Sequence, residues 1–144
     1  APIMDVVRQY DLIVTTHSSE PPGHEYHGKG STHPGVLWRL IQNYPDVTFV
    51  CAHWGGGLPF YALMPEVGKS LRNVYFDTAA SPLLYTSKVF ELTALLVGAD
   101  RMLLASDYAL IRARRILAQL NDSNLSEPER VAIMGGNATR LLHL

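Results

Sequence analysis

The sequence has a single cysteine, almost no net charge and no long apolar run. Each of these features excludes some classes of protein. Cys51 is the single cysteine among 144 residues, which excludes an internal disulfide framework and fits a reducing compartment. The formal net charge of −1 argues against nucleic acid or an acidic membrane as the main partner, because both attract basic surfaces. No apolar run approaches the roughly 18 residues of a membrane span, and no signal peptide is recognisable. We therefore expect a soluble, cytoplasmic protein.

The composition indicates one globular domain with a sizeable core. Hydrophobic residues make up 47% of the chain and charged residues 17%. The three arginines at 112, 114 and 115 are the one basic cluster, and we expect them on a solvated helix face. The chain begins with Ala1 and lacks an initiator methionine, so we expect residues upstream in the natural protein.

Two hydrophobic periods alternate along the chain. Apolar, often β-branched runs predict strands at 12–18, 47–53, 74–80 and 102–107. Helical periodicity predicts helices at 3–10, from Pro34 onward, at 58–71, at 84–97 and at 110–120, followed by a helical tail. Expected helix caps are Ser31 or Thr32, Gly98, Ser126 with Glu129, and Asn137. This order predicts an α/β fold whose parallel sheet is covered on both faces.

Each predicted strand ends in a polar group that can contact a ligand. His17 ends the first strand, His53 the second, Asp77 with Thr78 the third, and Ser106 with Asp107 the fourth. Parallel strands bring their carboxyl ends to one rim of the sheet, where α/β proteins build their sites. The sequence therefore predicts a functional site that combines imidazoles and carboxylates on this rim.

Five motifs carry a resemblance to a known family. TTHSSEPPGH, CAHWGGG, VYFDTAAS, GADRMLLASDY and IMGGNATRLL occur in the order found in the C-terminal half of the amidohydrolase superfamily. The sequence most resembles the amidohydrolase-2 group, which includes decarboxylases related to aminocarboxymuconate semialdehyde decarboxylase. The resemblance implies a (β/α)8 TIM barrel with one divalent metal, usually zinc. Residues 1–144 would then form the C-terminal half of this metal-dependent hydrolase domain: four β/α units and C-terminal helices.

The resemblance also implies a role for three residues of the predicted rim. His17 and Asp107 would bind the metal, and Asp107 would also take a proton from the metal-bound water. His53 would contact the substrate or that water. A divalent metal lowers the pKa of bound water from 15.7 to about 7, and imidazole and carboxylate groups are suitable ligands for zinc. The implied activity is hydrolysis or decarboxylation of a small carboxylated substrate, which would lie against the backbone of the glycines after His53.

The sequence departs from the family in ways that imply a partner. The His-x-His pair of the family's first strand is absent, and a whole barrel takes about 250 residues. Two ligands are too few for a catalytic zinc site, which has three protein ligands and water. We expect the chain to be a fragment of a longer enzyme, or to associate with an N-terminal half or a second copy. One alternative is a non-catalytic half barrel for binding or assembly, and another is a flavodoxin-like sheet that binds phosphate at the glycine loop.

Several of these residues also have plainer interpretations. His17 would be a hydrogen-bonded structural group, and Asp107 would cap the helix that follows it. Asp77 either orients a ligand histidine or bonds only to the next loop. His24 and His27 form an H-x-x-H pattern that we expect in a surface loop, and Cys51 is expected to be an inert core residue.

Overall fold

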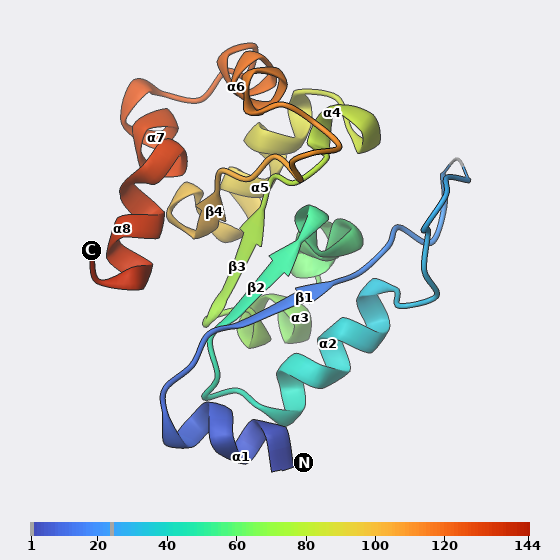
Figure 1. Cartoon of the computed structure of the whole chain (residues 1–144), viewed down its shortest axis with the longest axis vertical. Helices are drawn as coiled ribbons and strands as arrows, with labels where there is room; N and C mark the ends of the chain where they lie inside the picture. The colour runs from blue at the N-terminus through green and yellow to red at the C-terminus, as the bar shows by residue number, and fades with distance from the viewer. Residues whose placement is uncertain (1, 24) are drawn as a thin grey trace.

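A computed structural model describes residues 2–23 and 25–144, which form one four-stranded parallel sheet (Figure 1). The strands are β1 (Val14–His17), β2 (Phe49–Ala52), β3 (Val74–Asp77) and β4 (Met102–Leu103). They lie side by side in sequence order, and the register aligns His17 with Ala52 and Asp77 with Leu103. The carboxyl ends of all four strands therefore lie at one rim, as predicted.

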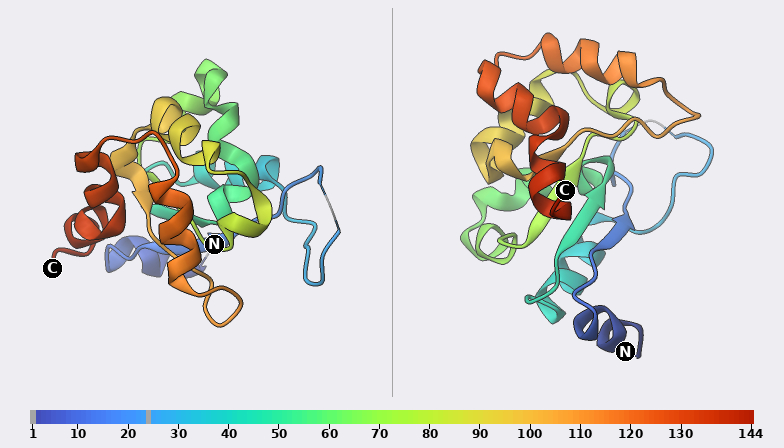
Figure 2. Two further views of the ribbon diagram at one scale, coloured as in Figure 1. Left: turned by 90° about the horizontal axis from the view of Figure 1, so that it is seen from above. Right: turned by 60° about the vertical axis from the view of Figure 1, so that its left-hand side comes forward.

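One helix precedes β1, and helices follow each of the four strands. Their bounds are α1 (Pro2–Gln9), α2 (Pro34–Asn43), η1 (His53–Leu63), α3 (Pro65–Ser70), α4 (Ser81–Leu84), α5 (Lys88–Val97), η2 (Ala99–Arg101), α6 (Ala113–Asn121), α7 (Glu127–Val131), η3 (Ala132–Gly136) and α8 (Asn137–Leu142). The helix predicted at 84–97 begins later, at Lys88, because Tyr85 adopts an extended conformation after α4. Between β1 and α2, the part of the described chain on either side of position 24 projects away from the sheet (Figures 1 and 2), whereas Ser18 and Ser19 are buried.

Alternate strand residues build the core on one face of the sheet. Phe49, Cys51, Phe76 and Met102 are fully buried and belong to the same apolar cluster as the helices. On the opposite face of β1, His17 and its neighbour two residues earlier are exposed. The prediction that both faces are covered is therefore wrong at this edge of the sheet, where no further strand lies beside β1 in the described chain.

The strand order distinguishes between the two predicted parallel architectures. Flavodoxin-like and other doubly wound sheets reverse direction at a switch point, so their first strand lies in the interior. The observed order β1-β2-β3-β4 contains no reversal. This is the order of successive strands in a (β/α)8 barrel, and it contradicts the flavodoxin-like alternative.

The C-terminal helices η3 and α8 pack against β4. Leu104 donates its backbone N–H to the carbonyl of Ile133 at 3.1 Å. The buried Asn137 amide donates to the carbonyls of Ala99 and Met102, both at 2.8 Å. The prediction that Asn137 caps the last helix is wrong, because Asn137 has helical backbone angles and its side chain bonds to η2 and to the first residue of β4 instead.

Two other helix starts also bear on the predicted caps. His33 caps α2 by accepting the Gly35 N–H on its Nδ1, so the choice of Ser31 or Thr32 was wrong. The capping box of Ser126 and Glu129 is confirmed, as is Gly98 at the end of α5. Within the described residues, no helix combines the length and apolarity that crossing a membrane requires.

Candidate functional site

Two histidines that are far apart in the sequence meet at the rim of the sheet, and Asp107 follows the last strand on the same rim. His17 is the last residue of β1 and His53 directly follows β2, and their ring centroids lie 4.8 Å apart, edge to face. Asp107 lies four residues beyond β4, where its carboxylate is exposed. Its negative charge acts to raise the pKa of both His17 and Asp77, so Asp107 lies within electrostatic range of these two side chains.

His17 is held by the loop that follows it. Its Nε2 lies 3.1 Å from Ser19 Oγ, which also accepts the Gly30 N–H at 3.0 Å. Burial of part of the ring lowers the pKa of His17, and the neighbouring His53 lowers it further, whereas Glu20 and Asp107 act in the opposite direction. The lowered pKa favours neutral imidazole, the form that binds a metal.

His53 is fixed by backbone and side-chain bonds to the end of β3. Its backbone N–H donates to Asp77 Oδ1 at 3.0 Å, and its Nδ1 lies 3.2 Å from the Ala79 carbonyl. A carbonyl only accepts hydrogen bonds, so Nδ1 carries the proton. The neutral ring then keeps its lone pair on Nε2, where it is available to a metal or a substrate proton.

The glycines after His53 form a left-handed turn. Five consecutive residues, 53 to 57, have φ between 56° and 89°. A Cβ on Gly56 would lie 2.8 Å from the Ser19 carbonyl oxygen, so the turn packs directly on the loop after β1. All three glycines are buried. The expectation that substrate lies against them is therefore wrong: they let the chain turn and let two loops touch.

Backbone strain is concentrated at this rim. Six described residues other than glycine have positive φ, and four of them follow the strand ends: His53, Trp54, Ala80 and Asp107. Each such residue costs about 1–2 kcal/mol, and it persists where surrounding contacts fix it. Trp54 has such contacts, because it is fully buried, packs edge to face on Phe90 and donates its Nε1–H to Ser81 Oγ at 2.9 Å.

Asp77 is buried behind the histidine pair. Burial raises its pKa, whereas the N–H groups of Ala79 and His53 act to lower it. The sequence left two interpretations of Asp77: it orients a histidine, or it bonds only to the next loop. The structure shows both kinds of contact. Asp77 accepts from the Ala79 backbone, and it fixes His53 through the backbone N–H of that residue.

Asp107 does not cap the next helix. Helix α6 begins at Ala113 with Arg112 at its N-cap, five residues further on. The Asp107 carbonyl accepts the N–H groups of Leu110 and Ile111, so the backbone closes a turn and the carboxylate is left at the rim. The interpretation of Asp107 as the cap of the following helix is therefore contradicted.

Sequence reasoning missed a carboxylate beside His17. Glu20 accepts hydrogen bonds from the hydroxyls of Tyr26 at 3.2 Å and Tyr85 at 3.3 Å. Burial raises the pKa of Tyr85, and the charge of Glu20 raises it further. The signal was the acidic residue three positions after a strand-end histidine, but its partners, 6 and 65 residues away, leave no sequence pattern.

The donor types at the rim fit a divalent metal, but the set is incomplete. Imidazole nitrogen and carboxylate oxygen are ordinary ligands of such ions. Within residues 2–23 and 25–144, no three His, Cys, Asp or Glu side chains are placed to hold a metal ion together. The donor types of His17 and Asp107 suit a metal ion, but the described residues do not form a complete site by themselves.

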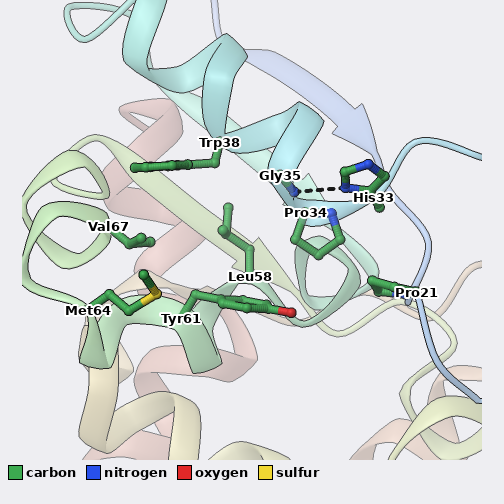
Figure 3. A pocket seen from close by; sticks show the side chains of 9 residues that line it. All are labelled: Pro21, His33, Pro34, Gly35, Trp38, Leu58, Tyr61, Met64 and Val67. Atoms are coloured by element: carbon green, nitrogen blue, oxygen red, sulfur yellow. Dashed lines mark hydrogen bonds between the residues drawn. The ribbon is translucent and has the colours of Figure 1, made fainter.

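A separate apolar pocket of about 320 Å³ lies between α2, η1 and α3 (Figure 3). Trp38 and Tyr61 face each other across it, and none of the three rim residues contributes to its lining.

The remaining residues singled out in the sequence lie apart from this rim. His27 is exposed in its loop as expected, and His24 lies outside the described residues. The arginine cluster is exposed, and Cys51 is buried, which raises the pKa of its thiol.

The strand order and the alternation of strands with helices define half of a (β/α)8 barrel. Comparison with known proteins gives the family: the chain belongs to the amidohydrolase family, whose model matches residues 1–144. The predicted amidohydrolase-2 membership is thereby confirmed. No curated protein matches the chain.

Solved structures confirm the half-barrel fold. A 2,6-dihydroxybenzoate decarboxylase from Rhizobium is 20% identical, with a TM-score of 0.75 over 99% of this chain and 54% of that one. A dihydroxybenzoic acid decarboxylase from Polaromonas sp. JS666, with bound manganese and the inhibitor 2-nitroresorcinol, is also 20% identical; its TM-score is 0.77, over 99% and 53%. A 5-carboxyvanillate decarboxylase from Sphingomonas paucimobilis is 14% identical, with a TM-score of 0.78 over 99% and 52%. The chain thus spans about half the length of the structures it matches.

Proposed function

We propose that this chain is the C-terminal half of a metal-dependent decarboxylase or hydrolase that acts on a small carboxylated molecule. The convergence of His17, His53 and Asp107 on one rim carries the proposal. Similar structures that are decarboxylases of hydroxylated aromatic acids favour decarboxylation. One of the similar structures holds manganese, so manganese is a candidate metal alongside the zinc that the family resemblance implied.

The rim residues supply the parts that such chemistry needs. His17 and Asp107 would hold the metal, which when bound polarises an oxygen of the substrate or activates water. His53 presents Nε2 beside His17 and exchanges a proton there. In a decarboxylation, the bond to the carboxylate breaks, its electron pair stays on the substrate carbon, and that carbon takes a proton. The protonated Nε2 of His53 is the proposed donor.

The proposed site needs further ligands from outside the described residues. We propose an N-terminal half of the barrel as their source, because β1 is an edge strand whose His17 is exposed. A second copy of this chain is the alternative. Light scattering on the isolated chain would detect a self-associating species, and a dilute monomer that keeps its fold would count against the second copy.

Metal binding at the rim can be tested on this chain directly. Dissolved Mn²⁺ broadens the NMR signals of nearby nuclei even when it binds weakly. We expect broadening at residues 17, 53 and 107, and we expect it to disappear in Asp107→Asn. Asp122→Asn is the matched control, since Asp122 is exposed at the end of α6, well away in sequence from the rim. Broadening at other surface carboxylates, with none at the rim, would refute the metal site.

Catalysis is tested in a complete protein that contains this half. Carbon dioxide release from a panel of hydroxylated benzoates should fall by more than a thousandfold in Asp107→Asn, but not in the Asp122→Asn control. If the complete protein binds no divalent metal and Asp107→Asn changes nothing, the chain is instead a binding or assembly module.

A further inference from the structure

Asp77, the last residue of β3, and the four residues that follow it, up to Ser81, form hydrogen bonds to two neighbouring loops. These residues are all buried, and we call them the positioning segment. On one side, the segment contacts the loop that carries His53; on the other, it contacts the loop that leads to Asp107. None of its side chains takes a part in the chemistry proposed above.

Asp77 and Ala79 hold His53 by two different groups. Asp77 Oδ1 accepts the His53 backbone N–H, and the Ala79 carbonyl accepts Nδ1–H from the His53 ring. The first bond fixes where the left-handed turn begins, and the second fixes the ring and its tautomer. Ser81 adds a third contact to the same loop. Its Oγ accepts the Nε1–H of the buried Trp54, the residue that follows His53.

Thr78 holds the opposite loop. Its hydroxyl donates to the Ala105 carbonyl at 2.9 Å and accepts the Ala105 N–H at the same distance. The β3–β4 pairing ends at Asp77 and Leu103. The two hydrogen bonds of Thr78 to Ala105 therefore extend the connection between the two chain segments by two residues towards Asp107. The loop therefore leaves β4 in a fixed direction although β4 itself is short.

We propose that Asp77 and Thr78 are positioning residues, which hold His53 and Asp107 in mutual register through the end of β3. A purely local role would leave this pattern unexplained. An aspartate that only closes its own turn bonds to the residue two positions on, as Asp77 does with Ala79. Its bond to His53 crosses to another strand, 24 residues away. The significance of the segment for catalysis rests on the function proposed above, whereas its hold on His53 does not.

The His53 tautomer is the first readout, because neither metal nor substrate is needed to observe it. Nitrogen NMR distinguishes a ring protonated at Nδ1 from one protonated at Nε2. In the wild-type chain we expect the Nδ1–H form to dominate at a pH where the ring is neutral. A dominant Nε2–H form would overturn the proposal without any variant.

Matched variants then separate positioning from simple loss of structure. Asp77→Ala removes both bonds of the carboxylate, and we expect the His53 ring to become a mixture of tautomers. Asp77→Asn keeps an oxygen acceptor of the same shape, so it should retain the wild-type tautomer. If Asp77→Ala folds with the wild-type tautomer and an unshifted His53 amide signal, the hold on His53 is refuted. If Asp77→Ala does not fold, the comparison of wild type with Asp77→Asn decides: loss of the Nδ1–H form in Asp77→Asn would also refute it.

Thr78 tests the other side of the segment. Thr78→Val keeps the shape but loses the hydroxyl, so the amide signals of 105–108 should shift while the His53 tautomer stays as in the wild type. Thr78→Ser should restore those signals. Unchanged signals at 105–108 in Thr78→Val would refute the role of Thr78.

Activity of a complete protein is the second readout. Asp77→Ala should lower kcat by about 10–100-fold, the usual cost of losing a group that orients a functional side chain, and Asp77→Asn should recover most of it. A shifted tautomer in a protein without activity or metal would refute the proposed function alone. Full activity in Asp77→Ala would refute the positioning role alone.

Discussion

The contact between Gly56 and the loop after β1 gives a sharp test of how the rim is assembled. A Cβ at position 56 would meet the Ser19 carbonyl oxygen at 2.8 Å and the Ser18 hydroxyl at 3.0 Å. Gly56 also has a φ of +61°. The variant Gly56→Ala therefore has two costs, one from its backbone conformation and one from the crowding of another backbone segment.

Gly28 offers a control that has only the first cost. Its φ is +92°, and nothing lies within 4 Å of the Cβ that alanine would add. The left-handed conformation costs an L-residue about 1–2 kcal/mol, which is the expected loss in Gly28→Ala. Overpacking typically costs about 1–3 kcal/mol more, so Gly56→Ala should lose about 2–5 kcal/mol in all.

Urea unfolding at 25 °C, followed by tryptophan fluorescence and circular dichroism, measures both variants. The two should share the wild-type dependence on urea and differ in midpoint. Gly56→Ala should also shift the NMR signals of His17, because Ser19 is displaced from its Nε2. Equal losses in Gly56→Ala and Gly28→Ala would show that the two loops do not touch, and the assembly described here would be wrong.

Two further stability predictions rest on single hydrogen-bonded side chains, and a third rests on the lowered pKa of His17. Asn137→Ala leaves the carbonyls of Ala99 and Met102 without their side-chain donor and should cost about 2–4 kcal/mol by urea unfolding, whereas Thr139→Ala on the exposed side of α8 should cost little; equal losses would refute the role of Asn137 at the start of β4. Ser81→Ala should cost about 1–3 kcal/mol, because the Trp54 Nε1–H then lacks an acceptor in the core, and a change within ±0.5 kcal/mol would refute that bond. His17 has a folded-state pKa below its ordinary value, so the unfolded chain binds more protons as the pH falls through 6.5. Stability should therefore fall between about pH 7.5 and about pH 5, less steeply in His17→Gln, and an identical slope would contradict the lowered pKa.

The sequence predicted the parts of the fold that depend on periodicity and on residue type. Apolar runs located all four strands, and the polar residue after each run located the rim with His17, His53 and Asp107. These predictions worked because a buried parallel strand must be apolar along its length, and the first polar residue marks where it reaches solvent. The strand ends were less accurate: β4 pairs only over Met102 and Leu103, because Leu104 turns its N–H to Ile133.

What the sequence did not predict depends on partners that are distant in the chain. The run of glycines after His53 indicated an unusual backbone, but not that it would pack on Ser19. An asparagine near a helix start indicates a cap, and nothing local shows that Asn137 instead bonds to the start of β4, 35 residues away. Side chains that bond across strands are chosen by the assembled fold, so they become visible only when the strands are in place.

The exposed edge at β1 and the shortage of metal ligands have a common physical origin. β2 and β3 are buried almost throughout, as strands inside a parallel sheet are, whereas alternate residues of β1 are exposed, including His17. In the proposed barrel, further strands add beside β1, and each brings its carboxyl end to the same rim. The same addition would therefore cover the exposed residues of β1 and place new side chains next to His17. A partner that covers β1 without supplying ligands would leave His17 and Asp107 without the further ligands that the proposed metal site needs. In the proposed barrel, one added segment would serve both purposes.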